Sequence, residues 1–217
     1  MTNAIAAIPA GPIGLENVTS QDLILPYIIL LQPLSKLSVQ DGMPAGVFAN
    51  TLSRKNLGKS IEIIPFKMSR YIDLLRPEGD RMIFETRITD EKDSRLEGRR
   101  FFRDGDLKAN AMSVISIMAS VSREPALIKF AKSSYRAGKE LITLAKIAGN
   151  AFFSRKYTLS SKMVSGENTY FIIAVSDAGP ASAEEQQQAY ALYRNFGGKA
   201  KDINESAPAP DDESVPF

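Results

Sequence analysis

The chain has 217 residues, 44% of them hydrophobic and 24% charged, with a formal net charge of +2. These values are typical of one globular domain, and no apolar run approaches the length of a membrane span. The absence of Cys and His excludes disulfides, thiolate zinc sites and catalysis by either residue. We therefore expect a cytoplasmic protein that is not an enzyme and holds no cofactor and no metal.

Positive charge is concentrated in the middle of the chain. Residues 54–162 carry 23 Lys or Arg and 13 Asp or Glu, a net charge of +10. Residues 208–217 carry three acids and no base. A basic middle and an acidic end favour two different partners, or binding of one to the other.

The hydrophobic pattern predicts mostly strands between two flexible ends. Residues 1–13, rich in Ala, Pro and Gly, are expected to be a disordered arm, and residues 199–217 a flexible acidic tail. Strands are expected at residues 27–32, 47–52, 60–67, 70–76, 82–88, 113–121, 126–131, 152–159 and 169–175. Helical spacing predicts one helix over 134–148, ended by Gly149, and a second from about residue 182 to 196.

These elements predict a single mostly β (α+β) domain over residues 14–198. Antiparallel strands commonly hide their edges by closing into a barrel, and an OB-like barrel has five strands and a helix among them. The strand count here exceeds five. We therefore expect an OB-like antiparallel barrel with extra hairpins, one internal helix and one C-terminal helix.

Two short motifs are better explained without catalysis. Residues 53–60 nearly match a phosphate-binding loop, but Ser53 replaces its first Gly and a strand-like run follows where the motif needs a helix. A basic hairpin loop is the favoured interpretation. Asp104 and Asp106 flank Gly105 and favour a turn over a Mg²⁺ site, because no further acid cluster completes a two-metal centre.

Basic and aromatic residues are interleaved in three segments. Single-stranded nucleic acid needs this mixture, because cations hold the phosphates and flat rings stack on the exposed bases. The expected phosphate-binding residues are Arg99, Arg100, Arg103, Lys132, Arg136, Lys139, Arg155 and Lys156. The expected stacking rings are Phe101, Tyr135, Phe153 and Tyr157, with Tyr71 as a weaker candidate.

Strand alternation would place Phe153, Arg155 and Tyr157 on one face of a strand over residues 152–159. The alternative left open by the sequence is that Phe153 and Tyr157 belong to the core and the bases only solubilise the protein.

The chain ends in Asp-Asp-Glu-Ser-Val-Pro-Phe after an Ala-Pro leash. This tip resembles the C-terminal tip of bacterial single-stranded DNA-binding proteins, with Val215 where Ile is usual. The basic body with an acidic aromatic tail also resembles phage proteins of that kind. The resemblance implies a protein that coats single-stranded DNA in replication and recombination and recruits partner proteins through its tail. The implied partner-binding residues are Asp211, Asp212, Glu213, Pro216 and Phe217.

Other functions stay open. A strand-annealing or recombination accessory protein would use the same basic aromatic surface in rings or filaments. A Mg-dependent nuclease and a structural virion protein are further alternatives. The sequence also leaves open the oligomeric state, including a homo-oligomer, and the preference for DNA or RNA.

Overall fold

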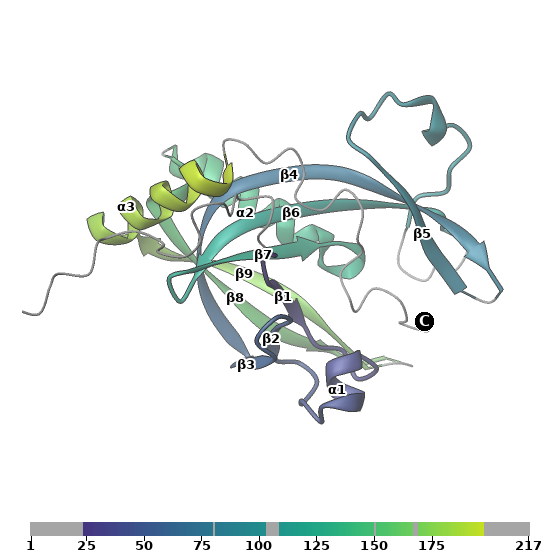
Figure 1. Cartoon of the computed structure of the whole chain (residues 1–217), viewed down its shortest axis with the longest axis horizontal. Helices are drawn as coiled ribbons and strands as arrows, with labels where there is room; N and C mark the ends of the chain where they lie inside the picture. Colours follow the sequence, from purple (N-terminus) through teal and green to yellow (C-terminus); the bar gives the residue numbers. More distant parts are fainter. Residues whose placement is uncertain (1–23, 80, 103–108, 150, 167–168, 198–217) are drawn as a thin grey trace, which may run out of the picture.

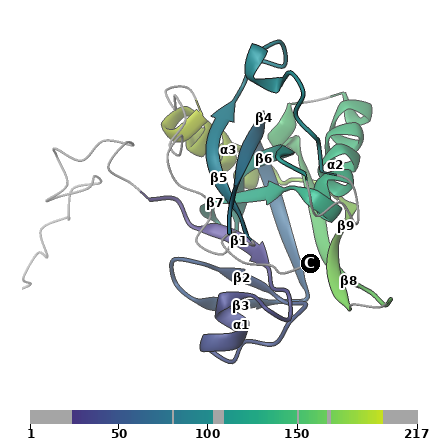
Figure 2. The ribbon, with the colours of Figure 1, turned by 90° about the vertical axis from the view of Figure 1, so that its right-hand side faces the viewer.

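The computed structural model describes residues 24–79, 81–102, 109–149, 151–166 and 169–197, which form one nine-stranded sheet with a long helix on each face (Figures 1 and 2). The strands run in the order β3-β2-β1-β7-β6-β4-β8-β9, and β5 pairs with β4. The strands are β1 Tyr27–Leu30, β2 Phe48–Asn50, β3 Lys55–Gly58, β4 Ser60–Glu78, β5 Arg81–Ile88, β6 Ala111–Val121, β7 Glu124–Phe130, β8 Arg155–Val164 and β9 Tyr170–Pro180. The α-helices are α1 Lys36–Gln40, α2 Tyr135–Ala148 and α3 Ala183–Leu192, and the shorter helical turns are η1 Ser94–Leu96, η2 Lys132–Ser134, η3 Phe152–Ser154 and η4 Tyr193–Gly197.

The longest strand, β4, joins the parts of the sheet. Its 19 residues pair with β8 at Ser60–Ile63, with β6 at Ile63–Leu74 and with β5 at Ile72–Glu78. The sequence predicted two strands here, over residues 60–67 and 70–76. The chain instead continues through a register shift between Pro65 and Lys67, where the proline lacks an N–H for the ladder. This strand arches across the top of Figure 1.

The two faces of the sheet carry separate cores. Successive residues of a strand point to opposite faces, so Ile117 and Met118 of β6 lie in different clusters. The inner face holds the largest cluster, which receives Leu141 of α2. The outer face packs against α3 and η4 through Leu192 and Phe196. Figure 2 shows α2 and α3 on opposite sides of the sheet.

The expected closed barrel is not what the sheet forms. In the described residues β3 and β9 are the two ends of the pairing path, and no strand pairing joins them. The pair β1–β7 is parallel, so the sheet is not fully antiparallel. The mostly β class is confirmed, and the OB-like barrel is not.

The edge strand β9 nevertheless approaches the segment that links β1 and β2. The Gln32 side chain, just after β1, donates from Nε2 to the Phe171 carbonyl and accepts from the Phe171 amide, both at 2.9 Å. Phe48 of β2 and Ile173 of β9 lie in the same inner core. A Cβ at Gly46, which has a φ of +78°, would lie 2.5 Å from the Phe171 ring. A side-chain amide therefore bridges a gap that strand pairing leaves open.

Several local signals are confirmed. Gly149 ends α2 with a left-handed φ of +69°. The second helix, predicted to start near residue 182, begins after Ser182, which caps α3 in a capping box with Glu185. Three further features differ from the sequence prediction: α1 and β3 were not expected, and Phe152–Ser154 forms a helical turn instead of the start of a strand. No helix among the described residues is long and apolar enough to cross a membrane.

Candidate nucleic-acid interface

Two of the three basic aromatic segments meet at the start of α2. The chain from Arg100 to Phe102 lies beside the first residue of β6, where the Phe102 amide donates to the Ala111 carbonyl at 2.8 Å. The adjacent strand β7 ends at Phe130, and the chain then turns through η2 into α2. The Lys132 ammonium consequently lies 6.0 Å from the centre of the Phe102 ring. Segments 30 residues apart therefore share one surface.

We group the basic and aromatic residues of these two segments as the α2 surface, which comprises Arg100, Phe101, Phe102, Lys132, Tyr135, Arg136 and Lys139. The contact that joins the segments is the one between Phe102 and Lys132. The Phe101 side chain is 39% exposed, and Tyr135 is half-buried. The Lys139 ammonium lies 5.4 Å from the Tyr135 ring, one helical turn away. The first turn of α2 holds no acid, and the Ser134 side chain makes no capping hydrogen bond. The positive end of the helix therefore adds to the side-chain charge here.

Two arginines near this surface are already in ion pairs. Arg99 bonds Glu85 at 3.1 Å, and Arg136 bonds Glu140 at 3.0 Å. The Arg136 side chain is 86% exposed, and exposed ion pairs contribute little. A phosphate can replace Glu140 as the partner of Arg136 with little loss of stability.

The third segment does not form the predicted single face. Tyr157 is 1% exposed and lies in the inner core, so its ring offers no face to a base. Burial raises the pKa of Tyr157 above its ordinary value. The residue is a core residue, which corrects its assignment as a stacking ring. Phe153 lies in η3 and not in a strand, so the alternation assumed for residues 152–157 fails.

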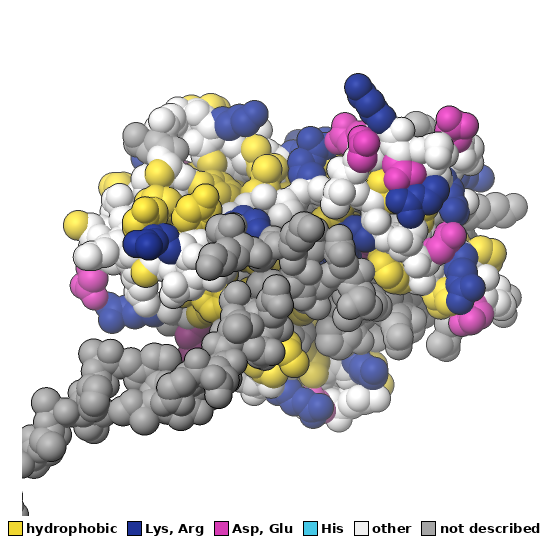
Figure 3. Space-filling model, turned by 45° about the horizontal axis from the view of Figure 1, so that its top comes forward, with side chains coloured by type: hydrophobic (Ala, Val, Ile, Leu, Met, Phe, Trp, Pro, Cys, Tyr) yellow, Lys and Arg dark blue, Asp and Glu magenta, His cyan; other side chains and the backbone are white. Residues whose placement is uncertain are grey.

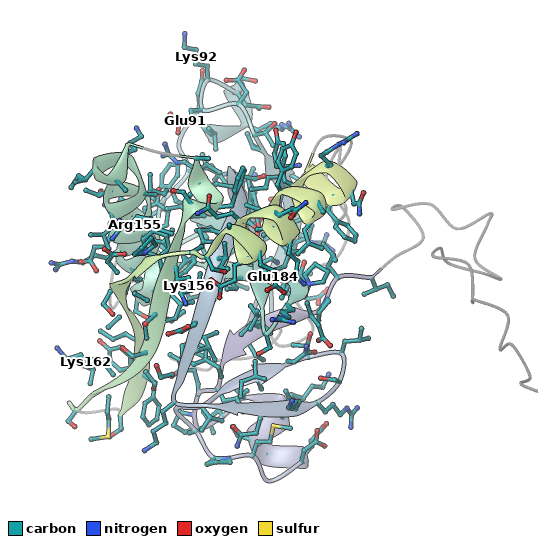
Figure 4. All side chains as sticks on the ribbon, turned by 90° about the vertical axis from the view of Figure 1, so that its left-hand side faces the viewer. Glu91, Lys92, Arg155, Lys156, Lys162 and Glu184 are labelled. Carbon is teal, nitrogen blue, oxygen red and sulfur yellow. The ribbon has the colours of Figure 1, made fainter. Side chains whose placement is uncertain are left out.

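The bases of the third segment are held by acids. Arg155 bonds both carboxylate oxygens of Asp177, with Nε to Oδ1 at 3.0 Å, and this bonding lowers the pKa of Asp177. The Lys156 ammonium lies 3.5 Å from Glu185 and 3.9 Å from Glu62. Figure 4 shows Lys156 close to α3 and Arg155 beside it in β8. Because both cations are paired with acids, neither Arg155 nor Lys156 adds an unpaired positive charge to the α2 surface.

Tyr71, the weaker stacking candidate, is also internal. Its side chain is 8% exposed, and the Arg87 guanidinium lies 3.8 Å from the ring centre. Arg87 bonds Asp73 at 2.7 and 3.1 Å in a pair with both side chains buried. Burial opposes the charge on Arg87, but these contacts outweigh it and raise its pKa. Tyr71 therefore packs against an internal ion pair, and its own pKa is raised by burial.

Two rings that the sequence reasoning passed over are exposed on the outer face. Tyr190 is 48% exposed and Tyr193 39% exposed. Their ring centres lie 6.4 Å apart with planes inclined by 21°. The centre of the Phe153 ring lies 5.7 Å from that of Tyr190. The signal that would have found them is the spacing of three residues on one helix, followed directly by Arg194.

Several predicted site residues lie outside the described residues. These are Arg103, Asp211, Asp212, Glu213, Pro216 and Phe217. Within the described ranges, no group of three or more acids forms a metal-binding cluster.

Comparison with known proteins gives one match. The family model described as Pam3 phage gp34-like protein covers residues 4–202, which is most of the chain and ends before the acidic tip. No curated protein and no solved structure matches the sequence. The extent of the family match shows that the chain belongs to the Pam3 phage gp34-like protein family.

Proposed function

We propose that the protein binds single-stranded DNA without reading its base sequence, through the α2 surface, during phage DNA replication or recombination. The observation that carries the proposal is the pairing of rings with cations from two distant segments: Phe102 with Lys132, and Tyr135 with Lys139. Bases stack on rings whatever their identity, and cations track the phosphates. Both requirements are met within a few residues of the start of α2.

A single strand fits this surface better than a duplex. Tyr135 packs partly against the inner core, and the exposed Phe101 ring and the exposed part of the Tyr135 ring can stack on bases only where those bases are unstacked. The acid-poor first turn of α2, with Lys132 and Lys139 beside it, favours phosphates between those bases. The excess positive charge of residues 54–162 adds a long-range attraction.

The test is a titration with labelled single strand and duplex of equal length at two salt concentrations. We expect preference for the single strand and a steep fall of affinity with salt, because phosphate contacts release counterions. Phe101→Ala should weaken binding by about 1–3 kcal/mol with little change of salt slope. Lys139→Ala should reduce the slope by about one.

Matched controls lie on the β8–β9 hairpin. Tyr170→Ala removes a ring that is 37% exposed, and Lys162→Ala removes a lysine far along the hairpin from Arg155, as Figure 4 shows. Both should bind as wild type. Equal affinity for duplex and single strand would refute the stacking model. Two further measurements test the alternative functions. Cleavage of the labelled strand after Mg²⁺ is added would indicate a nuclease, and a protein–DNA complex with the size of a ring or filament would indicate a strand-annealing protein.

The acidic tail is proposed to recruit partner proteins and to compete with DNA. Tethering gives an intramolecular polyanion a high effective concentration near the basic surface. Removal of residues 208–217 should therefore tighten DNA binding at low salt, and the gain should shrink as salt screens it. Phe217→Ala keeps the three acids, so competition should persist while partner capture is lost. Unchanged affinity after truncation, with equal partner capture by all three proteins, would show the tail to be inert.

A further inference from the structure

The rings on α3 lie outside the part of the helix that anchors it. Ala189 is fully buried against Ile64, and Leu192 packs onto the outer core. These residues account for the contact between α3 and the sheet. Beyond these anchors, Tyr190 and Tyr193 expose 48% and 39% of their surfaces to solvent.

Phe153 supports the exposed rings from below. It is half-buried and packs into both outer-face clusters, so its position is fixed by the body of the protein. Its ring contacts Tyr190, which in turn faces Tyr193 across near-parallel planes. A ring centre separation of 6.4 Å is near the long end of the range for stacked rings, about 4.5–7 Å. The three rings, here named the α3 ladder, form a pre-arranged stacking platform.

The charge around the ladder favours a polyanion. In the described residues 186–197, Arg194 is the one base and there is no acid. Arg194 is exposed and follows Tyr190 by one helical turn. The acids of α3 lie at its other end, where Glu184 pairs with Arg123 at 3.5 Å and Glu185 pairs with Lys156 at 3.5 Å. The left side of Figure 3 shows hydrophobic side chains gathered beside a Lys or Arg in this region.

We propose that Phe153, Tyr190 and Tyr193, with Arg194, form a second base-stacking site for single-stranded nucleic acid, separate from the α2 surface. The inference rests on the proposed function, because it extends the path of the same bound strand. Flat rings beside a cation suit bases joined by phosphates. In this site Phe153 acts indirectly, because its ring packs against Tyr190 and holds the Tyr190 ring in place.

The test uses the absence of Trp from the chain. Tyr190→Trp makes a protein with a single Trp on the ladder, where the native ring is 48% exposed, and Tyr170→Trp places one elsewhere, where the native ring is 37% exposed. On saturation with unlabelled oligothymidylate, emission of the first variant should fall, because bases stack on the indole. Emission of the second should not change. Tyr190→Ala with Tyr193→Ala should weaken binding of a long strand by roughly 5- to 150-fold, and Tyr190→Phe should retain it.

The outcomes separate this site from the α2 surface. If the single strand binds and Phe101→Ala weakens it while Trp emission at position 190 is unchanged, the second site is refuted and the proposed function stands. If wild type binds no single strand, both are refuted. If removal of residues 208–217 changes the emission at position 190 and DNA then does not, the ladder binds the tail and the proposal is overturned.

Discussion

Lys132 holds its backbone in the left-handed region, with a φ of +50°. This conformation costs an L-residue roughly 1–2 kcal/mol, and such strain persists where the surrounding structure enforces it, commonly at functional sites. The residue stands at the turn from β7 into α2, and the turn brings its ammonium toward the Phe102 ring. The strained backbone is therefore what joins the two segments of the α2 surface.

Lys132→Gly separates backbone strain from DNA binding. Glycine adopts a positive φ without steric cost, so the free energy of unfolding should stay within about 1 kcal/mol of wild type. DNA binding should lose one phosphate contact, and the salt slope should fall by about one. Arg54→Gly is the matched control, because it removes one charge at a φ of +52° in the β2–β3 turn and should leave binding unchanged. A large loss of stability with unchanged affinity would make Lys132 a structural residue.

The sequence identifies the types of residue at the site better than the direction in which they point. Phe101 and Tyr157 both lie among basic residues, yet one is exposed and the other is in the core. Tyr157 and Leu159 are two residues apart, so they point to the same face of β8. Both are buried, so this face is the inner one. The ion pair of Arg155 with Asp177 joins residues 22 apart and has no local signal.

At the scale of elements, α2 depends on close approach to the sheet. A Cβ at Gly138 would lie 2.8 Å from Phe130 Cβ and 3.1 Å from Ile115 Cδ1. In an exposed helix, replacing Gly by Ala stabilises by about 1 kcal/mol. Here the added methyl overpacks the inner core, which typically costs 1–3 kcal/mol. The second effect outweighs the first.

Gly138→Ala should therefore lower the free energy of unfolding, by about 1 kcal/mol or more, in a denaturant titration. Displacement of α2 moves Tyr135 and Lys139, so DNA affinity should also fall. Thr143→Ala on the exposed side of α2 is the control and should change stability by less than about 0.5 kcal/mol. A stabilised Gly138→Ala protein would show that the contact with Phe130 relaxes at no cost.

Element types were predictable where a local signal exists. The Gly149 cap and the Ser182 capping box fixed the ends of the two long helices. The continuity of β4 was not predictable, because Pro65 and Met68 interrupt the local pattern while pairing with β6 holds the chain extended. The helical turn at Phe152–Ser154 likewise depends on packing of Phe153 against the outer face.

For the whole molecule, the open sheet depends on contacts between distant segments. The mostly β composition predicted hidden edges, and a closed barrel was the simplest way to hide them. The structure instead joins the edge strand β9, at Phe171, to the segment after β1 through the side chain of Gln32, 139 residues away in sequence. No periodicity or turn signal encodes such a contact, so it could not be deduced from the sequence.

Gln32→Met tests how much this bridge contributes. The variant keeps the length of the side chain but removes both hydrogen bonds with the half-buried Phe171 backbone. Leaving buried polar groups unpaired costs about 1–3 kcal/mol, and the lower end is expected for a partly exposed site. Hydrogen exchange should show earlier opening of the Phe171 amide. No change in stability would mean that water replaces the amide fully.

Gln32→Glu makes the same bridge depend on pH. A protonated carboxyl group can donate to the Phe171 carbonyl and accept from the Phe171 amide, as the carboxamide does, whereas a carboxylate faces that carbonyl with a negative charge. The folded state therefore favours the neutral form and raises the pKa of the introduced group above its unfolded value of about 4.3. Its stabilising contribution is fully present below that pH and is lost as pH rises through the folded pKa. Relative to wild type, whose Gln does not titrate, the variant should approach equal stability at acidic pH and lose stability toward neutral pH. A stability difference that is constant with pH would show that the side chain at position 32 does not bridge to Phe171 of β9.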